Sequence, residues 1–142
     1  MRILFLDDSP ERHRKTEPLL IGHDVTWTWT APEAISARDG PRFDIAMLDH
    51  DLGGRVYTHD EPPSPEGTGQ DVATFIAQKM PGNRQPRYVV IHSFNGVGSM
   101  LMYYALEGNG YRYGENLVRW PWLTNGRPYP HTVTTWLAGS QS

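Results

Sequence analysis

The hydrophobic positions of this chain fall into short runs, and three of these runs end directly on polar residues. They are Ile3–Leu6, Ile45–Leu48 and Val89–Ile91. Short apolar runs bounded by turn residues are typical of strands buried on both faces of a parallel sheet. The carboxyl ends of such strands share one edge, and ligand sites form in the crevice outside that edge. We therefore expect the polar residues after the three runs to lie together.

Segments with helical sequence patterns separate these apolar runs, so strands and helices are predicted to alternate along the chain. Residues 25–30 alternate with period two, which is typical of a half-buried edge strand. Alternating strands and helices with right-handed crossovers predict an α/β, doubly wound sheet of about five mostly parallel strands. The third apolar run belongs to a predicted strand at 88–91, and one further strand is predicted at 116–120. The predicted helices run from Ser9 to about Leu20, from Ala31 to about Arg38, from Gly69 to Met80 and from Met100 to Glu107.

The length of 142 residues suits one domain spanning 1–142. Residues 52–68 are rich in Gly and Pro and have no sustained period, which predicts a long loop, either a lid over a site or a disordered segment. From about residue 121 the chain reads as a C-terminal extension. It either adds a short helix near 132–138 or simply covers the sheet.

Composition limits the classes of function and of partner. The net charge is -3 and the isoelectric point is about 6.0, so we expect no binding to duplex DNA or to an anionic membrane. There are no cysteines, which excludes disulfides, thiolate metal sites and cysteine nucleophiles. No signal peptide and no apolar segment of membrane-spanning length is recognisable, so the expected location is the cytoplasm. Composition does not predict the oligomeric state.

The polar residues that follow the three runs form a constellation of carboxylates and imidazoles. Carboxylates gathered this closely repel one another unless a cation or shared protons neutralise them, and a bound metal ion is the expected cation. Asp7, Asp8 and Asp49 suit Mg²⁺ or Mn²⁺, which prefer carboxylate oxygens. The other members, suited to acid–base chemistry, are His50, Asp51 and His92.

Most of these residues also have a purely structural explanation. Asp49 is harder to explain in this way, because Asp is disfavoured in strands and here follows a wholly apolar run. Asp7 or Asp8 could cap the first helix, Asp51 could cap a turn with Gly53-Gly54, and a single histidine at a strand end is usually a hydrogen-bonded structural residue. The segment 93–99 is either an ordinary tight turn or a cradle whose backbone N–H groups bind phosphate. Arg12 is either a solvated surface residue or a phosphate ligand.

The layout resembles that of response-regulator receiver domains over about residues 1–120. The acidic pair Asp7-Asp8, the phosphoacceptor position at Asp49 and the hydroxyl residue at Ser93 match that pattern. The resemblance implies a receiver-like (flavodoxin-like) sandwich. A receiver carries Lys before Pro on its last strand, whereas Trp120 precedes Pro121 here and Arg119 stands one place earlier. We therefore do not expect phosphorelay signalling.

A fuller set of motifs is similar to the cyclic-phosphate processing receiver-like family. For that family the resemblance implies a phosphoesterase site in which extra histidines act beside the acidic site. One departure is that Gly96-Val97-Gly98 replaces a form of the turn that contains Pro. The motifs are Phe5–Asp8 with Arg12, Leu48–Gly53, Thr68-Gly69, and Ile91–Asn95 with Gly98.

Together these features predict a metal-dependent phosphoesterase that hydrolyses a cyclic phosphate in a nucleotide or at an RNA end. Asp7, Asp8 and Asp49 would hold Mg²⁺ or Mn²⁺. His50 and His92 would act as base and acid, and Asp51 would either orient His50 or complete the metal shell. The expected phosphate-binding residues are Ser93, Asn95, Gly98 and Arg12. The alternatives are a non-catalytic receiver-like module that binds or sequesters a cyclic nucleotide, and a degenerate response-regulator receiver.

Overall fold

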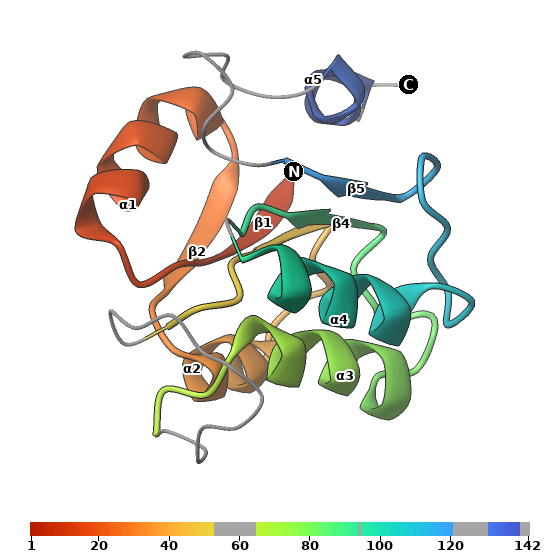
Figure 1. Cartoon of the computed structure of the whole chain (residues 1–142). Coiled ribbons are helices and arrows are strands. Elements are labelled where there is room, and N and C mark those ends of the chain that lie inside the picture. Colours follow the sequence, from red (N-terminus) through yellow and green to blue (C-terminus); the bar gives the residue numbers. More distant parts are fainter. Residues whose placement is uncertain (53–64, 94, 121–130, 140–142) are drawn as a thin grey trace.

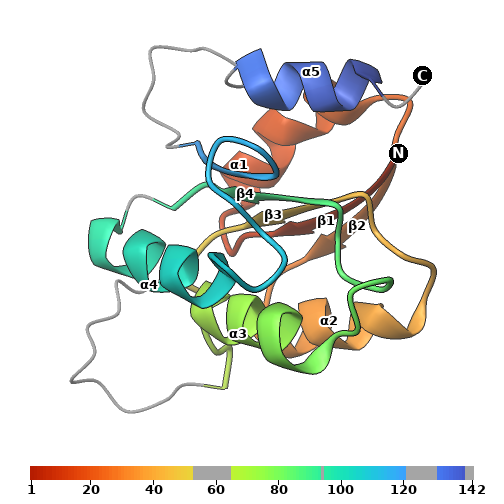
Figure 2. The same cartoon turned by 90° about the vertical axis from the view of Figure 1, so that its right-hand side faces the viewer.

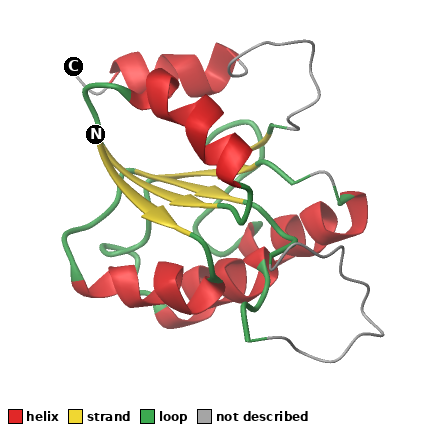
Figure 3. Cartoon of the chain, turned by 90° about the vertical axis from the view of Figure 1, so that its left-hand side faces the viewer, coloured by secondary structure: helices red, strands yellow, loops and turns green. Residues whose placement is uncertain are grey.

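A computed structural model describes residues 1–52, 65–93, 95–120 and 131–139. These residues contain a five-stranded parallel sheet with strand order β2-β1-β3-β4-β5. All the arrows in Figure 3 point the same way, so the carboxyl ends of the strands form one edge. The predicted doubly wound fold and the edge position of β2 are confirmed. The strands are β1 (Arg2–Leu6), β2 (Asp24–Thr28), β3 (Ile45–Leu48), β4 (Tyr88–Ile91) and β5 (Leu117–Arg119).

Helices cover both faces of the sheet. Helices α1 and α5 lie on one face, and α2, α3 and α4 lie on the other (Figures 1 and 2). None of the helices in the described ranges is long and apolar enough to cross a membrane. The helices are α1 (Pro10–Thr16), α2 (Ala31–Ser36), α3 (Gly69–Lys79), α4 (Gly96–Leu106) and α5 (His131–Gly139), with short 3₁₀ turns η1 (Glu17–Leu20) and η2 (Ala37–Asp39).

The sheet separates two hydrophobic cores because side chains alternate across each strand. In β1, Leu4 and Leu6 belong to the core beneath α2, α3 and α4. Ile3 and Phe5 belong to the core on the opposite face, where Trp136 of α5 also packs. The C-terminal extension therefore contributes a helix that completes a core, which confirms one of the two alternatives for residues 132–138.

Two helix boundaries differ from the predicted ones for local reasons. Helix α1 changes to a 3₁₀ turn at Glu17, because Pro18 has no N–H to continue the α-helical ladder. Helix α4 begins at Gly96, four residues before the predicted Met100, because the Asn95 side chain accepts a hydrogen bond from Gly98 N and caps it.

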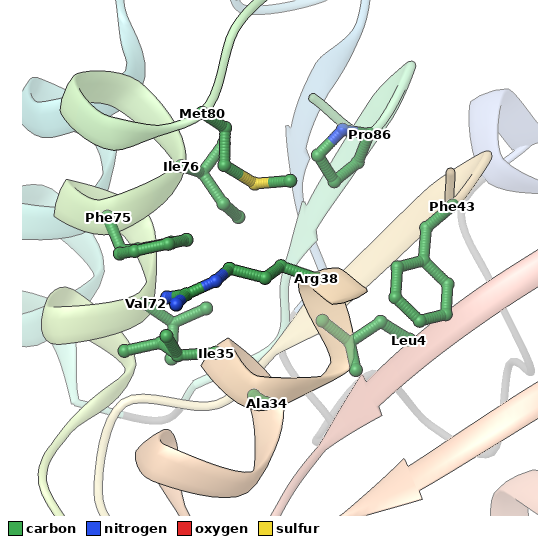
Figure 4. Close-up of a pocket in the computed structure, with 10 residues that line it drawn as sticks. All are labelled: Leu4, Ala34, Ile35, Arg38, Phe43, Val72, Phe75, Ile76, Met80 and Pro86. Atoms are coloured by element: carbon green, nitrogen blue, oxygen red, sulfur yellow. The ribbon is translucent and has the colours of Figure 1, made fainter. Parts of the chain in front are cut away.

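A cavity of only about 20 Å³ lies between α2, α3 and the sheet, toward the amino ends of β3 and β4 (Figure 4). The Arg38 guanidinium lies over the Phe75 ring at this opening, 5.2 Å from the ring centroid. A space of this size holds at most about one water molecule, so it is a packing gap and no ligand site.

Two predicted features lie partly outside the described residues. The long loop at 52–68 includes residues 53–64, and the extension from about 121 includes residues 121–130; neither range is described. The two descriptions of the loop, a lid or a disordered segment, therefore both stay predictions.

Candidate functional site

The backbone ladder places the polar residues after β1, β3 and β4 side by side. Asp7 N donates to Thr28 O (3.2 Å), Asp49 N donates to Leu6 O (3.0 Å), and His92 N donates to Leu48 O (3.0 Å). Each hydrogen bond extends the parallel pairing one residue beyond the strand. The predicted convergence at the carboxyl edge is therefore a direct consequence of strand register.

Asp7, Asp49 and His92 form a buried cluster at this edge. One ligand atom from each residue lies within 4.8 Å of the others, and the three residues are 0%, 3% and 0% exposed. His92 Nδ1 is 3.5 Å from Asp7 Oδ2, and its ring stacks on Phe5 with centroids 5.1 Å apart. Asp8 lies at the rim of the cluster, with a side chain 16% exposed. We call Asp7, Asp49 and His92 the buried triad.

Arg12 neutralises part of this negative charge from within the protein. Its Nε donates to Asp7 Oδ2 (2.7 Å), and its Nη2 donates to Asp7 Oδ1 (2.8 Å) and to Asp49 Oδ2 (3.2 Å). The same Nη2 lies 3.5 Å from Asp8 Oδ1. Bidentate pairing of this kind is among the stronger polar contacts in proteins. Arg12 is thus neither a solvated surface residue nor free for a phosphate in this conformation.

The electrostatics of the triad follow from burial. Desolvation, together with the neighbouring Asp7 carboxylate, raises the pKa of Asp49 to about 8, although Arg12 acts in the opposite direction. Burial lowers the pKa of His92 to about 4, so its imidazole is neutral at pH 7. A neutral imidazole can act as a metal ligand.

The stability of the metal-free protein should therefore depend on pH in a specific way. Between about pH 4 and 6.5, Asp49 is protonated in the folded protein but ionised in the unfolded chain, whereas His92 is neutral in the folded protein but protonated in the unfolded chain. The two differences change the free energy of unfolding in opposite directions as pH rises. Between pH 6.5 and 8 only the Asp49 effect remains, and the free energy of unfolding should fall by up to about 2 kcal/mol as pH rises. Urea denaturation with a chelator present measures this fall.

Asp49→Asn is the variant that identifies the titrating group. It keeps the shape of the side chain but cannot ionise, so its stability should stay level from pH 6.5 to 8. The surface variant Asp39→Asn, whose side chain is 82% exposed, should retain the wild-type fall. A wild-type stability that is flat or rising across this interval would contradict the raised pKa of Asp49.

A second group of side chains consists of His50 and Asp51, which directly follow Asp49, and Asn95, which follows β4. His50 Nδ1 donates to Asp51 Oδ1 (2.8 Å), and Asn95 Nδ2 donates to the same oxygen (3.1 Å). A carboxylate that accepts from Nδ1 fixes the imidazole tautomer and leaves Nε2 as the proton acceptor. Asp51 and Asn95 thus orient His50 in the way that general bases are commonly oriented.

Two glycines allow backbone and ring to approach closely at this edge. A Cβ on Gly98 would lie 2.3 Å from His50 Cγ, so only glycine lets α4 pack against the imidazole. A Cβ on Gly69 would lie 1.9 Å from Asp49 O, and Gly69 N donates to His50 O (2.9 Å). The Thr68-Gly69 and Gly98 motifs therefore fix the position of residues 49 and 50 by steric fit.

The segment 93–99, predicted as either a tight turn or a phosphate-binding cradle, is partly helical. Residues 96–98 form the first turn of α4, and Gly98 N donates to Asn95 Oδ1 (2.9 Å). Ser93 is fully buried, and its Oγ accepts from Asn95 N (3.0 Å). In this conformation Gly98 and Asn95 therefore have capping contacts of their own.

Among the described residues, His13 also contacts this edge, although the sequence analysis did not single it out. Its Nε2 donates to Asp7 O (2.7 Å), and its ring stacks on Trp29 with centroids 3.7 Å apart. His13 thus holds the backbone of a triad residue. Its place one residue after Arg12 on α1 was the available signal, but an i to i+1 spacing does not indicate which side chains face the sheet.

Comparisons with known proteins agree with this architecture. Residues 2–108 match the cyclic-phosphate processing receiver domain family. That range includes the buried triad, Arg12 and the His50–Asp51–Asn95 group. No curated protein matches the sequence significantly.

Solved structures of receiver domains share the fold. A CheY-like receiver domain protein from Methanospirillum hungatei JF-1 is 19% identical with a TM-score of 0.57, covering 84% of this chain and 81% of its own. The Mn²⁺-bound response regulator Rcp1 is 18% identical with a TM-score of 0.55, covering 83% and 78%. A Burkholderia pseudomallei response regulator with a phosphorylated aspartic acid, a calcium ion and citrate is 11% identical with a TM-score of 0.60, covering 96% and 65%.

The similarity to solved structures supports the fold, and the family match assigns the sequence to a family. The match covers most of the chain, and the motifs that carry it lie at the carboxyl edge of a receiver-type sheet. The chain therefore belongs to the cyclic-phosphate processing receiver domain family.

Proposed function

We propose that this protein is a metal-dependent phosphoesterase that hydrolyses a cyclic phosphate in a nucleotide or at an RNA end. The observation that carries the proposal is the pairing, at one sheet edge, of a buried carboxylate–imidazole triad with an oriented histidine. His50, held by Asp51, supplies acid–base capacity, and Asp7, Asp49 and His92 supply metal-binding capacity. The family name adds the class of substrate.

The residues present fit a divalent cation. Two carboxylates and one imidazole offer ligand atoms within 4.8 Å of one another, and Asp8 is close by at the rim. This mixed oxygen and nitrogen set suits Mn²⁺, and the carboxylates also suit Mg²⁺. Two proteins of the same fold were solved with a divalent cation, Rcp1 with Mn²⁺ and the Burkholderia protein with a calcium ion, which supports the choice of a divalent cation here.

When bound, the ion would polarise a phosphoryl oxygen and favour ionisation of water. His50 Nε2 would take a proton from the attacking water as its oxygen forms a bond to phosphorus. The ring oxygen would leave on the opposite side of phosphorus as the phosphorus–oxygen bond of the ring breaks, and would take a proton from solvent. The imidazolium of His50 would return its proton to solvent, which completes the cycle.

We assign His92 to metal binding in preference to acid–base catalysis. It is fully buried, and a pKa near 4 makes it a poor proton donor at neutral pH. Ser93 and Arg12 are the proposed phosphate-binding side chains. For Arg12, this role requires its guanidinium to move from Asp7 and Asp49, which an incoming divalent cation would favour by charge repulsion.

The direct test of the function is a substrate panel. Purified protein would be incubated with Mn²⁺ and with 2′,3′- and 3′,5′-cyclic nucleotides, cyclic dinucleotides and RNA that ends in a 2′,3′-cyclic phosphate. Chromatography should detect a linear phosphate product from at least one of them, and a chelator should abolish its formation. If a panel member binds but is recovered intact with every metal, the protein is a binder.

Metal binding should also be visible without turnover. Mn²⁺ should raise the melting temperature of the wild-type protein by mass action. When the ion is at 100 times its dissociation constant, the free energy of unfolding should rise by about 2.7 kcal/mol. Asp49→Asn should reduce this increase, because it removes one buried carboxylate ligand. Differential scanning fluorimetry and isothermal titration calorimetry measure the two effects.

Arg12→Gln distinguishes the triad from a general acidic surface. It removes the cation that already pairs with Asp7 and Asp49, so Mn²⁺ should bind more tightly to this variant while the metal-free protein becomes less stable. Asp39→Asn, on the exposed η2 turn, serves as the control and should bind Mn²⁺ as the wild type does. Equal stabilisation of wild type and Asp49→Asn would contradict a metal site at the triad.

A non-catalytic binder or receiver-like module is the second candidate function. Arg12 favours it, because the acidic edge already has a protein cation and can be stable without an ion. A degenerate phosphorelay receiver has less support. Trp120 is buried at the end of β5, where a receiver carries lysine, and only a persistent phosphoadduct on Asp49 would favour that reading.

A further inference from the structure

Helix α4 exposes an apolar face that the proposed catalytic chemistry does not use. Its eleven residues, GVGSMLMYYAL, include no Asp, Glu, Lys or Arg. Met100 and Tyr104 on its outer side are 47% and 65% exposed. The outward face of a surface helix is normally polar, and a group of exposed apolar residues commonly marks a binding site.

This face borders a cavity of about 520 Å³ between α4 and the ends of β4 and β5. Three tyrosines form its aromatic wall: the Tyr103 ring lies 5.3 Å from that of Tyr104 and 5.8 Å from that of Tyr113, both edge-on. Arg119 adds a positive charge to a lining that is otherwise aromatic, apolar or hydroxyl-bearing among the described residues. We call this space the tyrosine cavity.

The tyrosine cavity adjoins the proposed catalytic edge. Ile91 and Arg119, which line it, are register partners at the carboxyl ends of β4 and β5. Ile91 is followed directly by His92 of the buried triad. Ser99, also in the lining, donates from Oγ to Ser93 O (3.4 Å), so a single buried residue connects the cavity wall to the proposed phosphate-binding segment.

We propose that the tyrosine cavity binds the base of a cyclic nucleotide whose phosphate lies at the acidic edge. Pockets for small ligands usually measure about 300–1,000 Å³ and combine aromatic walls with a few polar groups. Tyrosine rings stack on any nucleobase, and an arginine adds a planar cation that stacks on a base or donates to its carbonyl oxygens. The inference rests on the proposed function and narrows its substrate to a cyclic phosphate that carries a base.

The test compares a ligand with a base to one without. Binding of 2′,3′-cyclic AMP and 3′,5′-cyclic AMP, and of the base-free ribose 2,3-cyclic phosphate, would be measured by calorimetry with the full chain in the presence of Mn²⁺. All proteins in this titration would carry His50→Ala, so that the ligands are not hydrolysed during the measurement. Tyr104→Ala and Tyr113→Ala should weaken binding of at least one cyclic nucleotide by about 5- to 150-fold, the contribution of stacking one base. The base-free compound should bind all variants equally.

Conservative variants separate stacking from folding. Tyr104→Phe and Tyr113→Phe keep the rings and should bind cyclic nucleotide within about twofold of the wild type. Val97→Ala changes an exposed apolar residue of the same helix outside the cavity lining and should have no effect. Melting temperatures would establish that each alanine variant is folded, and the Arg119→Gln variant should weaken nucleotide binding without altering Mn²⁺ binding.

These experiments distinguish failure of the tyrosine cavity inference from failure of the proposed phosphoesterase function. If cyclic nucleotides bind or turn over normally in the Tyr104→Ala and Tyr113→Ala proteins, the tyrosine cavity inference is wrong and the phosphoesterase proposal stands. If the wild type neither binds nor hydrolyses any cyclic phosphate, both are wrong. If the alanine variants instead convert a wild-type oligomer to monomer in analytical ultracentrifugation, with nucleotide binding unchanged, the face joins copies of the chain and the inference is overturned.

Discussion

Replacing His50 by alanine should lower kcat for the cyclic-phosphate substrate by about 10²- to 10⁴-fold, the usual contribution of a general acid–base group. His50 is the histidine at this edge whose Nδ1 donates to a carboxylate, Asp51, at 2.8 Å, so its Nε2 has a defined role as proton acceptor. Because the ion would be held by other residues, the affinity for Mn²⁺ should not change. Single-turnover rates and calorimetry measure the two quantities.

Two further variants make the His50 result specific. His23→Ala removes an imidazole that contacts the N-terminal amine (3.1 Å) at the opposite edge of the sheet, and its activity should equal that of the wild type. Asp51→Ala should lower kcat by less than His50→Ala does, since Asp51 acts only by positioning the imidazole. A His50→Ala protein that is folded and retains more than a tenth of the wild-type rate would remove His50 from the mechanism.

Replacing Gly69 by alanine should destabilise the fold by about 3 kcal/mol or more, at or above the upper end of the range for overpacked sites. The new Cβ would lie 1.9 Å from Asp49 O and 2.9 Å from Met102 Cε. A backbone oxygen cannot move aside as a side chain can, so α3 or the residues after β3 must shift. Urea denaturation should report the lost stability, and metal binding should weaken because Asp49 carries a triad ligand.

Gly96→Ala is the matched control for this prediction. Gly96 is also the first residue of a helix, α4, but a Cβ there would meet no atom within 4 Å. Alanine has a higher helix propensity than glycine, so this variant should be neutral or slightly stabilising. If the Gly69→Ala protein were as stable as the Gly96→Ala protein, the inference that α3 packs tightly on residues 49 and 50 would be wrong.

The fold and the location of the site could largely be predicted from the sequence. Continuous apolar runs such as Ile45–Leu48 indicate strands buried on both faces, and polar residues directly after them must lie at the shared carboxyl edge. Such inferences succeed because an apolar run and the alternation of side chains are local properties of a strand, and because neighbouring parallel strands end at the same edge. The boundaries of α1 and α4 were less accurate, since Pro18 and the Asn95 cap act at single positions.

Contacts between distant segments were decided only by the tertiary structure. The distance between Arg12 on α1 and Asp49 after β3 depends on how the helix packs on the sheet, so sequence spacing could not show that the guanidinium lies among the carboxylates. The complete burial of His92, which lowers its pKa, likewise depends on Phe5 and the helices that cover that face. Sequence therefore determined which residues reach the edge, and packing determined their charge states and partners, because desolvation and ion pairing act through space.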